Sequence, residues 1–246
     1  MRVPRLLLPG RSLEPGVFEF DGDPAHHLGR VLRRRVGDPV ILCDGEGAAF
    51  EGVIEALDGK RCRVRLERAC EDQVESPLNL RLGLALLRGE RMDYALQKSC
   101  ELGVSAIDLL LTERVEVRLD GKRLANRMRH FEGVVAHALQ QSGRSRLPVL
   151  SAPQSLSDWL ATLPDDGGRL VLDPEGAPLT ASAAADTATA WTLTSGPEGG
   201  FEAAEVEQLA ASGFARVRLG PRILRAETAP VAALSVLQWL HGDLGH

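Results

Sequence analysis

The chain has 246 residues, of which 44% are hydrophobic and 26% are charged, a balance typical of a soluble globular protein with one large or two small domains. Its formal net charge of −5 excludes a basic footprint spread over the whole chain, so only local basic segments are candidates for nucleic-acid contact. No apolar run approaches the roughly 20 residues that span a bilayer, and the apolar run near the start is too short for a signal peptide. We therefore expect a cytosolic (cytoplasmic) protein without a membrane partner.

The cysteines argue against a metal site. Cys43, Cys62, Cys70 and Cys100 include no C-x-x-C pair, and no histidine lies at metal-ligand spacing from them. We expect free thiols in a reducing compartment and no bound metal.

Residues 1–72 contain short strand-like segments separated by Gly, Asp and Pro. In RCRVRLER, residues 61–68, apolar and basic residues alternate, so one face is predicted to be buried and the other exposed. This spacing predicts a small barrel or sandwich, followed by a polar, Pro-containing linker at 73–78. The other strand segments are 17–20, 39–44 and 48–57.

A basic segment, HHLGRVLRRRVGD, lies between these strands at residues 26–38. Arginine pairs with phosphate through its planar guanidinium group, so this segment favours RNA contact. A solvated basic face balanced by nearby aspartates is the alternative, because charge runs are usually solvated. An RNA surface requires this segment and the strand at 61–68 to face the same side. The candidate RNA-binding residues here are Arg30, Arg33, Arg34, Arg35, Arg61, Arg63 and Arg65.

From residue 79 the pattern changes to strands that alternate with helices, which predicts an α/β domain with a parallel sheet over residues 79–246. Gly103 and Gly143 stand where helices are expected to end. In open α/β sheets, ligands bind beyond the carboxyl ends of the strands, so the loops at those ends are the candidate site. We expect strands at 78–87, 104–112, 169–173, 189–196 and 215–220, and helices at 91–102, 123–143, 202–213 and 228–240.

Two loops rich in Gly and Pro follow such strands: SGPEGGF at 195–201 and LGPRILRAETA at 219–229. Neither matches the glycine pattern of a dinucleotide site or of a P-loop. A phosphate at the first loop would meet Glu198 as a like charge. Tight turns that expose backbone N–H and C=O groups can instead bind an adenine edge. S-adenosylmethionine (SAM), which has a sulfonium and no phosphate, fits these loops better than a nucleotide does.

The two loops resemble the signature of the RsmE family, the small-subunit rRNA uridine N3-methyltransferases of the SPOUT superfamily. Further motifs follow in the family order: HHLGRVLRRRVGD, RGERMDYALQKSCELGVSAI, TER at 112–114 and QQSGRSRLP at 140–148. The resemblance covers nearly the whole chain. One departure is Gln140, because the family often has Glu-Gln before Ser-Gly-Arg, and any role for a carboxylate there is absent.

The resemblance implies a PUA-like β-barrel joined to a SPOUT α/β domain whose C-terminal chain forms a deep trefoil knot. It also implies SAM as the cofactor, 16S rRNA or the small ribosomal subunit as the partner, and a homodimer with the cofactor pocket near the subunit interface. Arg144 and Arg146 are further RNA-binding candidates, expected on the α/β domain. The expected cofactor-binding residues are Leu172, Leu193, Thr194, Gly196, Pro197, Glu198, Gly199, Gly200, Leu219, Gly220, Ile223, Leu224, Arg225 and Thr228.

The implied reaction is SAM-dependent methylation of uracil N3 at a specific uridine of 16S rRNA. N3 carries an imide proton and lies on the Watson–Crick edge, so the target uridine must be unpaired. Arg225 directly follows the second loop and is the candidate for stabilising negative charge on the base, with Glu227 or Glu198 as proton acceptor. A salt bridge between Arg225 and Glu227 at the start of the last helix is the alternative. Cys100 lies among apolar neighbours, so we expect a core residue rather than a nucleophile.

Two other functions compete with this interpretation. One is a non-catalytic rRNA-binding or ribosome-assembly protein with a vestigial SAM pocket, which the intact glycine loops disfavour. The other is a dinucleotide-dependent oxidoreductase, which would need the glycine fingerprint that the chain lacks. Calorimetry with SAM separates the methyltransferase from the assembly protein. Micromolar binding supports the methyltransferase, and an absence of binding at millimolar SAM supports the assembly protein.

We predict that Arg33→Glu weakens RNA binding and flattens its dependence on salt, because each lost phosphate contact removes counterion release. SAM binding should stay unchanged. Filter binding of rRNA over a salt series, with SAM calorimetry as the control, measures both effects. Unchanged RNA affinity at low salt would contradict a role for this basic segment.

Overall fold

The computed structural model describes residues 3–71, 74–116, 121–180 and 188–245. The chain packs as two units: an N-terminal unit of Met1–Glu75 with Ala136–Leu147, and a C-terminal unit of Ser76–Val135 with Pro148–His246. The first division falls between Glu75 and Ser76, within the linker expected at residues 73–78. Residues 72 and 73 lie outside the described residues. Residues 136–147 pack with the N-terminal unit although the residues before and after them in the chain belong to the C-terminal unit.

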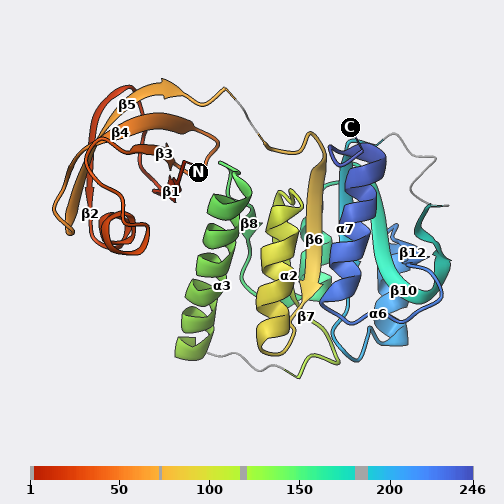
Figure 1. Cartoon of the computed structure of the whole chain (residues 1–246). Helices are drawn as coiled ribbons and strands as arrows, with labels where there is room; N and C mark the ends of the chain where they lie inside the picture. Colours follow the sequence, from red (N-terminus) through yellow and green to blue (C-terminus); the bar gives the residue numbers. More distant parts are fainter. Residues whose placement is uncertain (1–2, 72–73, 117–120, 181–187, 246) are drawn as a thin grey trace. The chain divides into compact units, whose positions relative to one another are not determined.

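The N-terminal unit is built on a mixed five-stranded sheet in the order β1-β3-β4-β5-β2 (Figure 1). β1 pairs parallel with β3, and the other neighbours pair antiparallel. Because β1 and β2 stand at the two ends of this order, the ladder of the described residues is open. The strands are β1 (Arg5–Leu7), β2 (Gly16–Asp21), β3 (Pro39–Cys43), β4 (Ala49–Leu57) and β5 (Arg61–Ala69).

The core of this unit lies on one face of the sheet. In β5 the predicted alternation is confirmed, since Cys62, Val64 and Leu66 are at most 2% exposed and the three arginines between and before them are exposed. Apolar side chains from all five strands join one buried cluster, and each fully buried Val or Leu contributes roughly 1.5–3 kcal/mol. Burial raises the pKa of the Cys62 thiol to about 11, so this thiol is inert at neutral pH.

The basic segment forms a short helix that changes its winding. It begins as α1 (Asp23–His26) and continues as the π-helix η1 (His27–Val31). The N–H of Leu32 donates to the carbonyl of His27 at 2.9 Å, the five-residue spacing that defines a π turn. Arg33 follows with φ of 53°, a conformation that a residue with a side chain rarely adopts.

The C-terminal unit is built on a parallel sheet in the order β12-β10-β11-β6-β7-β8, with β9 also paired to β7. Every pairing in this sheet is parallel among the described residues, which confirms the predicted α/β class. The deep trefoil knot stays a prediction. The strands are β6 (Asn79–Ala85), β7 (Ala106–Leu111), β8 (Val149–Leu150), β9 (Gln154–Ser155), β10 (Gly168–Pro178), β11 (Ala190–Ser195) and β12 (Ala215–Arg218).

Helices cover this sheet. α2 packs beside α7 (Figure 1). α4 packs against β7, and a second buried cluster includes Trp159 and Phe214. α4 was missed by the sequence analysis because a seven-residue helix shows little periodicity. No helix within the described ranges is long and apolar enough to cross a membrane. The helices are α2 (Glu90–Glu101), α3 (Gly121–Ser142), α4 (Leu156–Thr162), α6 (Ala203–Ala211) and α7 (Thr228–His241).

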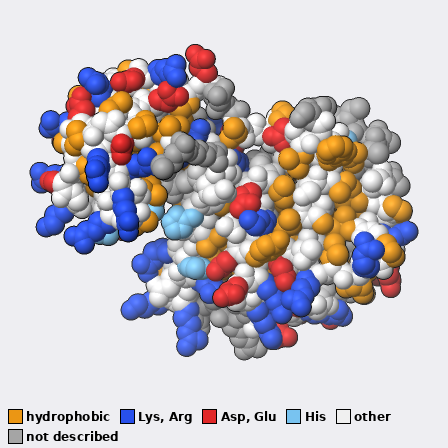
Figure 2. Space-filling view, in the orientation of Figure 1, with side chains coloured by type: hydrophobic (Ala, Val, Ile, Leu, Met, Phe, Trp, Pro, Cys, Tyr) orange, Lys and Arg blue, Asp and Glu red, His pale blue; other side chains and the backbone are white. Residues whose placement is uncertain are grey.

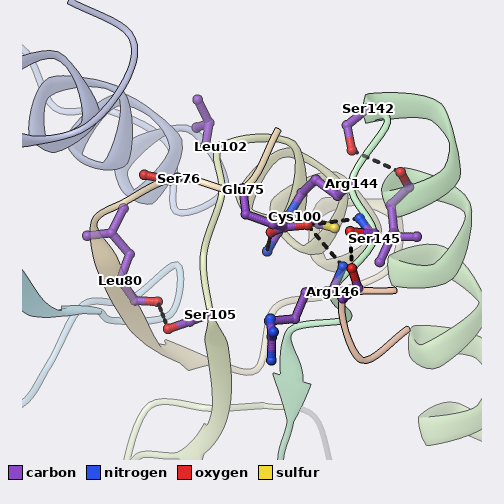
Figure 3. A network of polar contacts seen from close by, with 12 residues as sticks. Glu75, Ser76, Leu80, Cys100, Leu102, Ser105, Ser142, Arg144, Ser145 and Arg146 are labelled. Atoms are coloured by element: carbon purple, nitrogen blue, oxygen red, sulfur yellow. Dashed lines mark hydrogen bonds and ion pairs between the residues drawn. The ribbon is translucent and has the colours of Figure 1, made fainter. Parts of the chain in front are cut away.

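A buried ion pair ties residues 144–146 into the N-terminal unit (Figure 3). The guanidinium Nε of Arg144 donates to Glu75 Oε2 at 2.8 Å, and the backbone N–H groups of Ser145 and Arg146 both donate to Glu75 Oε1 at 2.9 Å. The Arg144 side chain is 4% exposed. The prediction that Arg144 binds RNA on the α/β domain was therefore wrong, because its guanidinium group is buried against Glu75 in the other unit.

We predict that Arg144→Met lowers the free energy of unfolding by about 3 kcal/mol, since removal of one partner leaves the other charge buried and uncompensated. Urea unfolding at neutral pH measures the change. Arg123→Met, at an exposed position of α3, is the matched control and should have little effect. A loss no larger than that of the control would contradict the structural role of the pair.

The same network predicts a dependence on pH. Burial alone would raise the pKa of Glu75, but hydrogen bonds from the Arg146 and Ser145 N–H groups and the charge of Arg144 hold it below its usual value. A carboxyl group whose pKa falls on folding adds stability that is complete above its unfolded-state pKa and is lost as pH falls through the folded-state value. Glu75→Gln should therefore destabilise the protein at pH ~7 and cost progressively less below about pH 4. Urea midpoints of both proteins across this range test the prediction, and a constant difference would refute it.

Candidate cofactor site

A cavity of about 870 Å3 lies in the C-terminal unit at the ends of β10, β11 and β12. Parallel strands present their carboxyl ends at one edge of a sheet, which is why both Gly-Pro loops reach the same cavity. In β10 the pairing register with β12 shifts between Leu172 and Ala177, and residues of this irregular stretch form part of the cavity wall. The wall includes these residues from the expected cofactor-binding set: Leu172, Gly196, Pro197, Glu198, Gly199, Gly200, Leu219, Gly220, Ile223 and Leu224.

Four residues of that set do not line the cavity. Leu193 and Thr194 are fully buried in β11, where the Thr194 hydroxyl donates to the carbonyl of Gly83 at 3.0 Å. Arg225 and Thr228 lie in the C-terminal part of the second loop, and neither is part of the cavity wall. Cys100 is also confirmed as a buried residue, with its Sγ 3.7 Å from the carbonyl of Val135.

The first loop closes on itself. The N–H of Gly200 donates to the carbonyl of Pro197 at 2.9 Å, and Gly200 has φ of 73°, which favours glycine. A Cβ at Gly196 would lie 3.1 Å from backbone atoms of Gly200 and Phe201. A side chain at Gly196 therefore requires these atoms to shift by a few tenths of an ångström.

Glu198 is turned toward the segment before α2. Its Oε1 accepts the backbone N–H of Arg88 at 3.2 Å and pairs with the guanidinium Nη1 of Arg91 at 3.0 Å. Burial alone would raise the pKa of Glu198, but these groups and its own N–H hold it below its usual value. Glu198 is therefore a poor proton acceptor, and the sequence-based reason for excluding phosphate was wrong, since Arg91 offsets its charge.

Arg114 holds the other side of the loop. Its Nη1 donates to the carbonyl of Gly199 at 2.6 Å, and its Nε donates to Glu202 Oε1 at 2.7 Å. Arg114 is the last residue of the TER motif at 112–114, but its sequence position alone indicates no role in the cavity. Its partners lie more than eighty residues away, so no local pattern could reveal the contact.

Glu205 joins the same strand end to α6. This carboxylate is 7% exposed and accepts the N–H of Glu113 at 3.0 Å and that of Glu202 at 2.8 Å. The second of these bonds belongs to a capping box that begins α6. The glycine loop is thus fixed between α2, the end of β7 and the start of α6 before any ligand binds.

The remaining wall carries paired charges. Arg216 Nε lies 2.7 Å from Asp173 Oδ2, and its Nη2 lies 3.5 Å from Glu175 Oε2. Arg218 donates to the carbonyl of Gly176. The wall holds four arginines and four carboxylates, so its formal charges cancel, which suits a ligand of low net charge. No group of His, Cys, Asp and Glu that could hold a metal ion exists among the described residues.

The two residues expected to be catalytic, Arg225 and Glu227, lie side by side in the C-terminal part of the second loop. Arg225 Nη1 is 3.9 Å from Glu227 Oε1, and the Arg225 side chain is 77% exposed whereas that of Glu227 is 13% exposed. Glu227 Oε2 is buried and accepts no hydrogen bond from the described residues. The pair is a loose contact that leaves the guanidinium group exposed, while the unbonded oxygen of Glu227 is buried.

The RNA-binding candidates differ in their surroundings, and Figure 2 shows Lys and Arg side chains on the visible face of the N-terminal unit. Arg63 lies 2.6 Å from Glu19, and Arg65 lies 3.6 Å from Glu55. For these two residues the alternative of a neutralised, solvated face has structural support. Arg34 is half-buried, and the exposed candidates are Arg30, Arg33, Arg35, Arg61 and Arg146.

Comparisons with known proteins agree with this architecture. Residues 74–238 match the RNA methyltransferase domain, and residues 20–67 match the RNA methyltransferase PUA domain. The ribosomal RNA small subunit methyltransferase E of Mycobacterium tuberculosis (strain CDC 1551 / Oshkosh) is 33% identical over 227 residues, which cover 90% of this chain and 86% of the relative. The chain belongs to this family. The family member of Bacillus subtilis (strain 168) is 28% identical, with 94% of each chain covered.

Solved structures of the family have the same fold. A ribosomal RNA small subunit methyltransferase E from Neisseria gonorrhoeae, bound to SAM, is 33% identical with a TM-score of 0.91 and covers 99% of this chain and 100% of its own. A Legionella pneumophila protein described as a putative methyltransferase, in complex with SAM, is 35% identical with a TM-score of 0.90 over the same shares. The family resemblance and the two-domain class inferred from the sequence are confirmed.

We predict that Gly196→Ala weakens SAM binding about tenfold without unfolding the chain, because the added Cβ would lie 3.1 Å from backbone atoms of Gly200 and Phe201 and requires the turn to shift. Gly133→Ala is the matched control, since nothing lies within 4 Å of the Cβ that it adds. Isothermal titration with SAM and circular dichroism measure binding and folding. Equal affinity in both variants would show that the shape of this turn does not matter.

Proposed function

We propose that this protein is a SAM-dependent 16S rRNA (uracil-N3)-methyltransferase. The observation that carries the proposal is the cavity between the two Gly-Pro loops. A family relative whose structure matches this chain with a TM-score of 0.91 was solved with SAM bound. The names of the curated relatives give the small-subunit rRNA as their substrate. The uridine and its N3 atom come from the RsmE resemblance of the motifs.

SAM fits the chemistry of this cavity. The turn at Pro197–Gly200 exposes backbone groups that can bind an adenine edge, while Leu172, Leu219 and Leu224 supply apolar walls for the ring. When bound, SAM supplies a methyl group on a positively charged sulfur. The loop is already anchored by Arg114 and Glu198, so little conformational entropy is lost on binding.

The chain must lower the barrier to attack by N3. Loss of the imide proton leaves negative charge spread over N3, O2 and O4, and the exposed guanidinium group of Arg225 can stabilise this charge. Glu227 contacts Arg225 through Oε1, so this oxygen can orient Arg225 or accept the imide proton, whereas Oε2 is buried. The new N–CH3 bond forms as the sulfur–methyl bond breaks, and the proton leaves through Glu227 or water.

Three further features belong to this proposal. The substrate places the protein in the cytoplasm, where ribosomal subunits assemble. A homodimer is supported by exposed apolar side chains, namely Ile223 at 84% and Trp239 at 64%, and Figure 2 shows hydrophobic side chains gathered over α7. Exposed arginines of the N-terminal unit, including Arg30 and Arg33, provide phosphate contacts to the rRNA.

The direct test is methyl transfer. Ribosomal RNA from a strain that lacks this protein is incubated with the purified enzyme and SAM carrying a labelled methyl group, and the nucleosides are separated by mass spectrometry. The expected product is 3-methyluridine at one site. Binding of SAM without any transfer, to free rRNA or to assembled small subunits, would favour the non-catalytic assembly protein instead.

We predict that Arg225→Met lowers kcat about 100-fold, because a group that stabilises developing negative charge is typically worth that factor. SAM affinity should change little, since Arg225 lies outside the cavity wall. Single-turnover methylation of rRNA measures the effect. Arg123→Met on α3 is the matched control, and a rate equal to that of this control would refute the catalytic role of Arg225.

A further inference from the structure

A second cavity, of about 320 Å3, lies within the N-terminal unit. We name it the histidine pocket, because three imidazole side chains line it. Its volume falls within the range of small-molecule sites, at the lower end. The polar lining is His26, His27, His137, Asp23 and Gln140, and the apolar lining is Leu6, Leu7, Pro24 and Val31.

The pocket is fixed by the amide of Gln140. Its Oε1 accepts the N–H of Leu7 at 3.3 Å, and its Nε2 donates to the carbonyl of Ala136 at 3.3 Å. These bonds join the end of α3 to β1 on one side of the pocket. Because both ends of the amide are engaged, Gln140 serves as wall, and the imidazoles and Asp23 remain as the groups that can meet a ligand.

The backbone opposite carries two rare conformations. Consecutive residues of an α-helix point about 100° apart, yet His26 and His27 both line the pocket, and the winding changes from α to π between them. Two residues after the π turn, Arg33 has φ of 53°. Such conformations cost stability and are found most often at functional sites.

The lining selects a nucleobase rather than a phosphate. Imidazole rings and apolar side chains stack on a base, whereas the carboxylate of Asp23 repels phosphate and accepts hydrogen bonds from the N–H groups of a base edge. Arg30 and Arg33 flank the lining residue Val31, are exposed, and form no ion pair with the described residues. They are suited to the phosphates on either side of such a base.

We propose that the histidine pocket binds one unpaired nucleotide of the RNA substrate, with its base in the pocket and its flanking phosphates at Arg30 and Arg33. The inference rests on the proposed function, because it takes RNA as the substrate. It adds a second contact to an unpaired nucleotide, distinct from the uridine that is methylated. RNA that lacks an unpaired nucleotide at the required place would then be a poor substrate even where its target uridine is accessible.

The test uses the full chain and a fluorescently labelled single-stranded oligoribonucleotide. His137→Ala and His26→Ala should each weaken binding about tenfold, the usual effect of removing one stacking partner. His130→Ala is the matched control, because it lies on the same helix as His137 but pairs with Asp93 at 2.8 Å and does not line the pocket. Circular dichroism and SAM titration confirm that each variant is folded.

The salt dependence separates the two kinds of contact. His137→Ala should leave the slope of affinity against salt unchanged, while Arg33→Glu should flatten it. Equal affinity of His137→Ala, His26→Ala and His130→Ala would overturn the pocket, and so would equal binding of duplex RNA by the wild type. Loss of binding in the pocket variants, with no methyl transfer by the wild type, would instead uphold the pocket and refute the proposed enzyme.

Discussion

The anchoring of one glycine loop by distant charged side chains is the constraint on which the candidate site depends. A glycine-rich segment has a large conformational entropy, so it forms a defined cavity wall only where other groups hold it. Glu198 binds the segment before α2, and Arg114 binds the carbonyl of Gly199 from the end of β7. The parallel sheet brings these strand ends to one edge, and the ionic contacts then fix the loop between them.

A carboxylate organises a chain segment in each unit by the same means. Glu205 accepts one backbone N–H group from Glu113, after β7, and one from Glu202, at the start of α6. Glu75 accepts two backbone N–H groups and one guanidinium group from residues 144–146. Hydrogen bonds to a buried carboxylate are strong, and leaving such a charge unpaired is costly. These two groups therefore select one arrangement of the chain over its alternatives as well as stabilising it.

Much of the fold was predictable from the sequence because periodicity reports burial directly. The alternation in β5 and the apolar strands of the parallel sheet needed no knowledge of partners. Roles that depend on a distant partner were not predictable in this way. Glu198 lines the cavity as expected, but its contact with Arg91, 107 residues earlier, was not foreseen. Arg144 was expected to contact RNA and is buried on Glu75, 69 residues earlier. The π turn at His27–Val31 was missed for a different reason, since no residue pattern marks a change of helical winding.

The same ion pairs explain how a chain of net charge −5 can present a basic surface to RNA. Electrostatic attraction depends on the charges left uncompensated, and many carboxylates of this chain are committed to internal partners. Glu19, Glu51 and Glu75 each pair with an arginine of the N-terminal unit. Arg30 and Arg33, by contrast, have no ion pair with the described residues and are exposed. Residues 26–35 carry four arginines and no carboxylate, so this segment is positive although the whole chain is acidic, and net charge alone is a poor guide to the charge of a local surface.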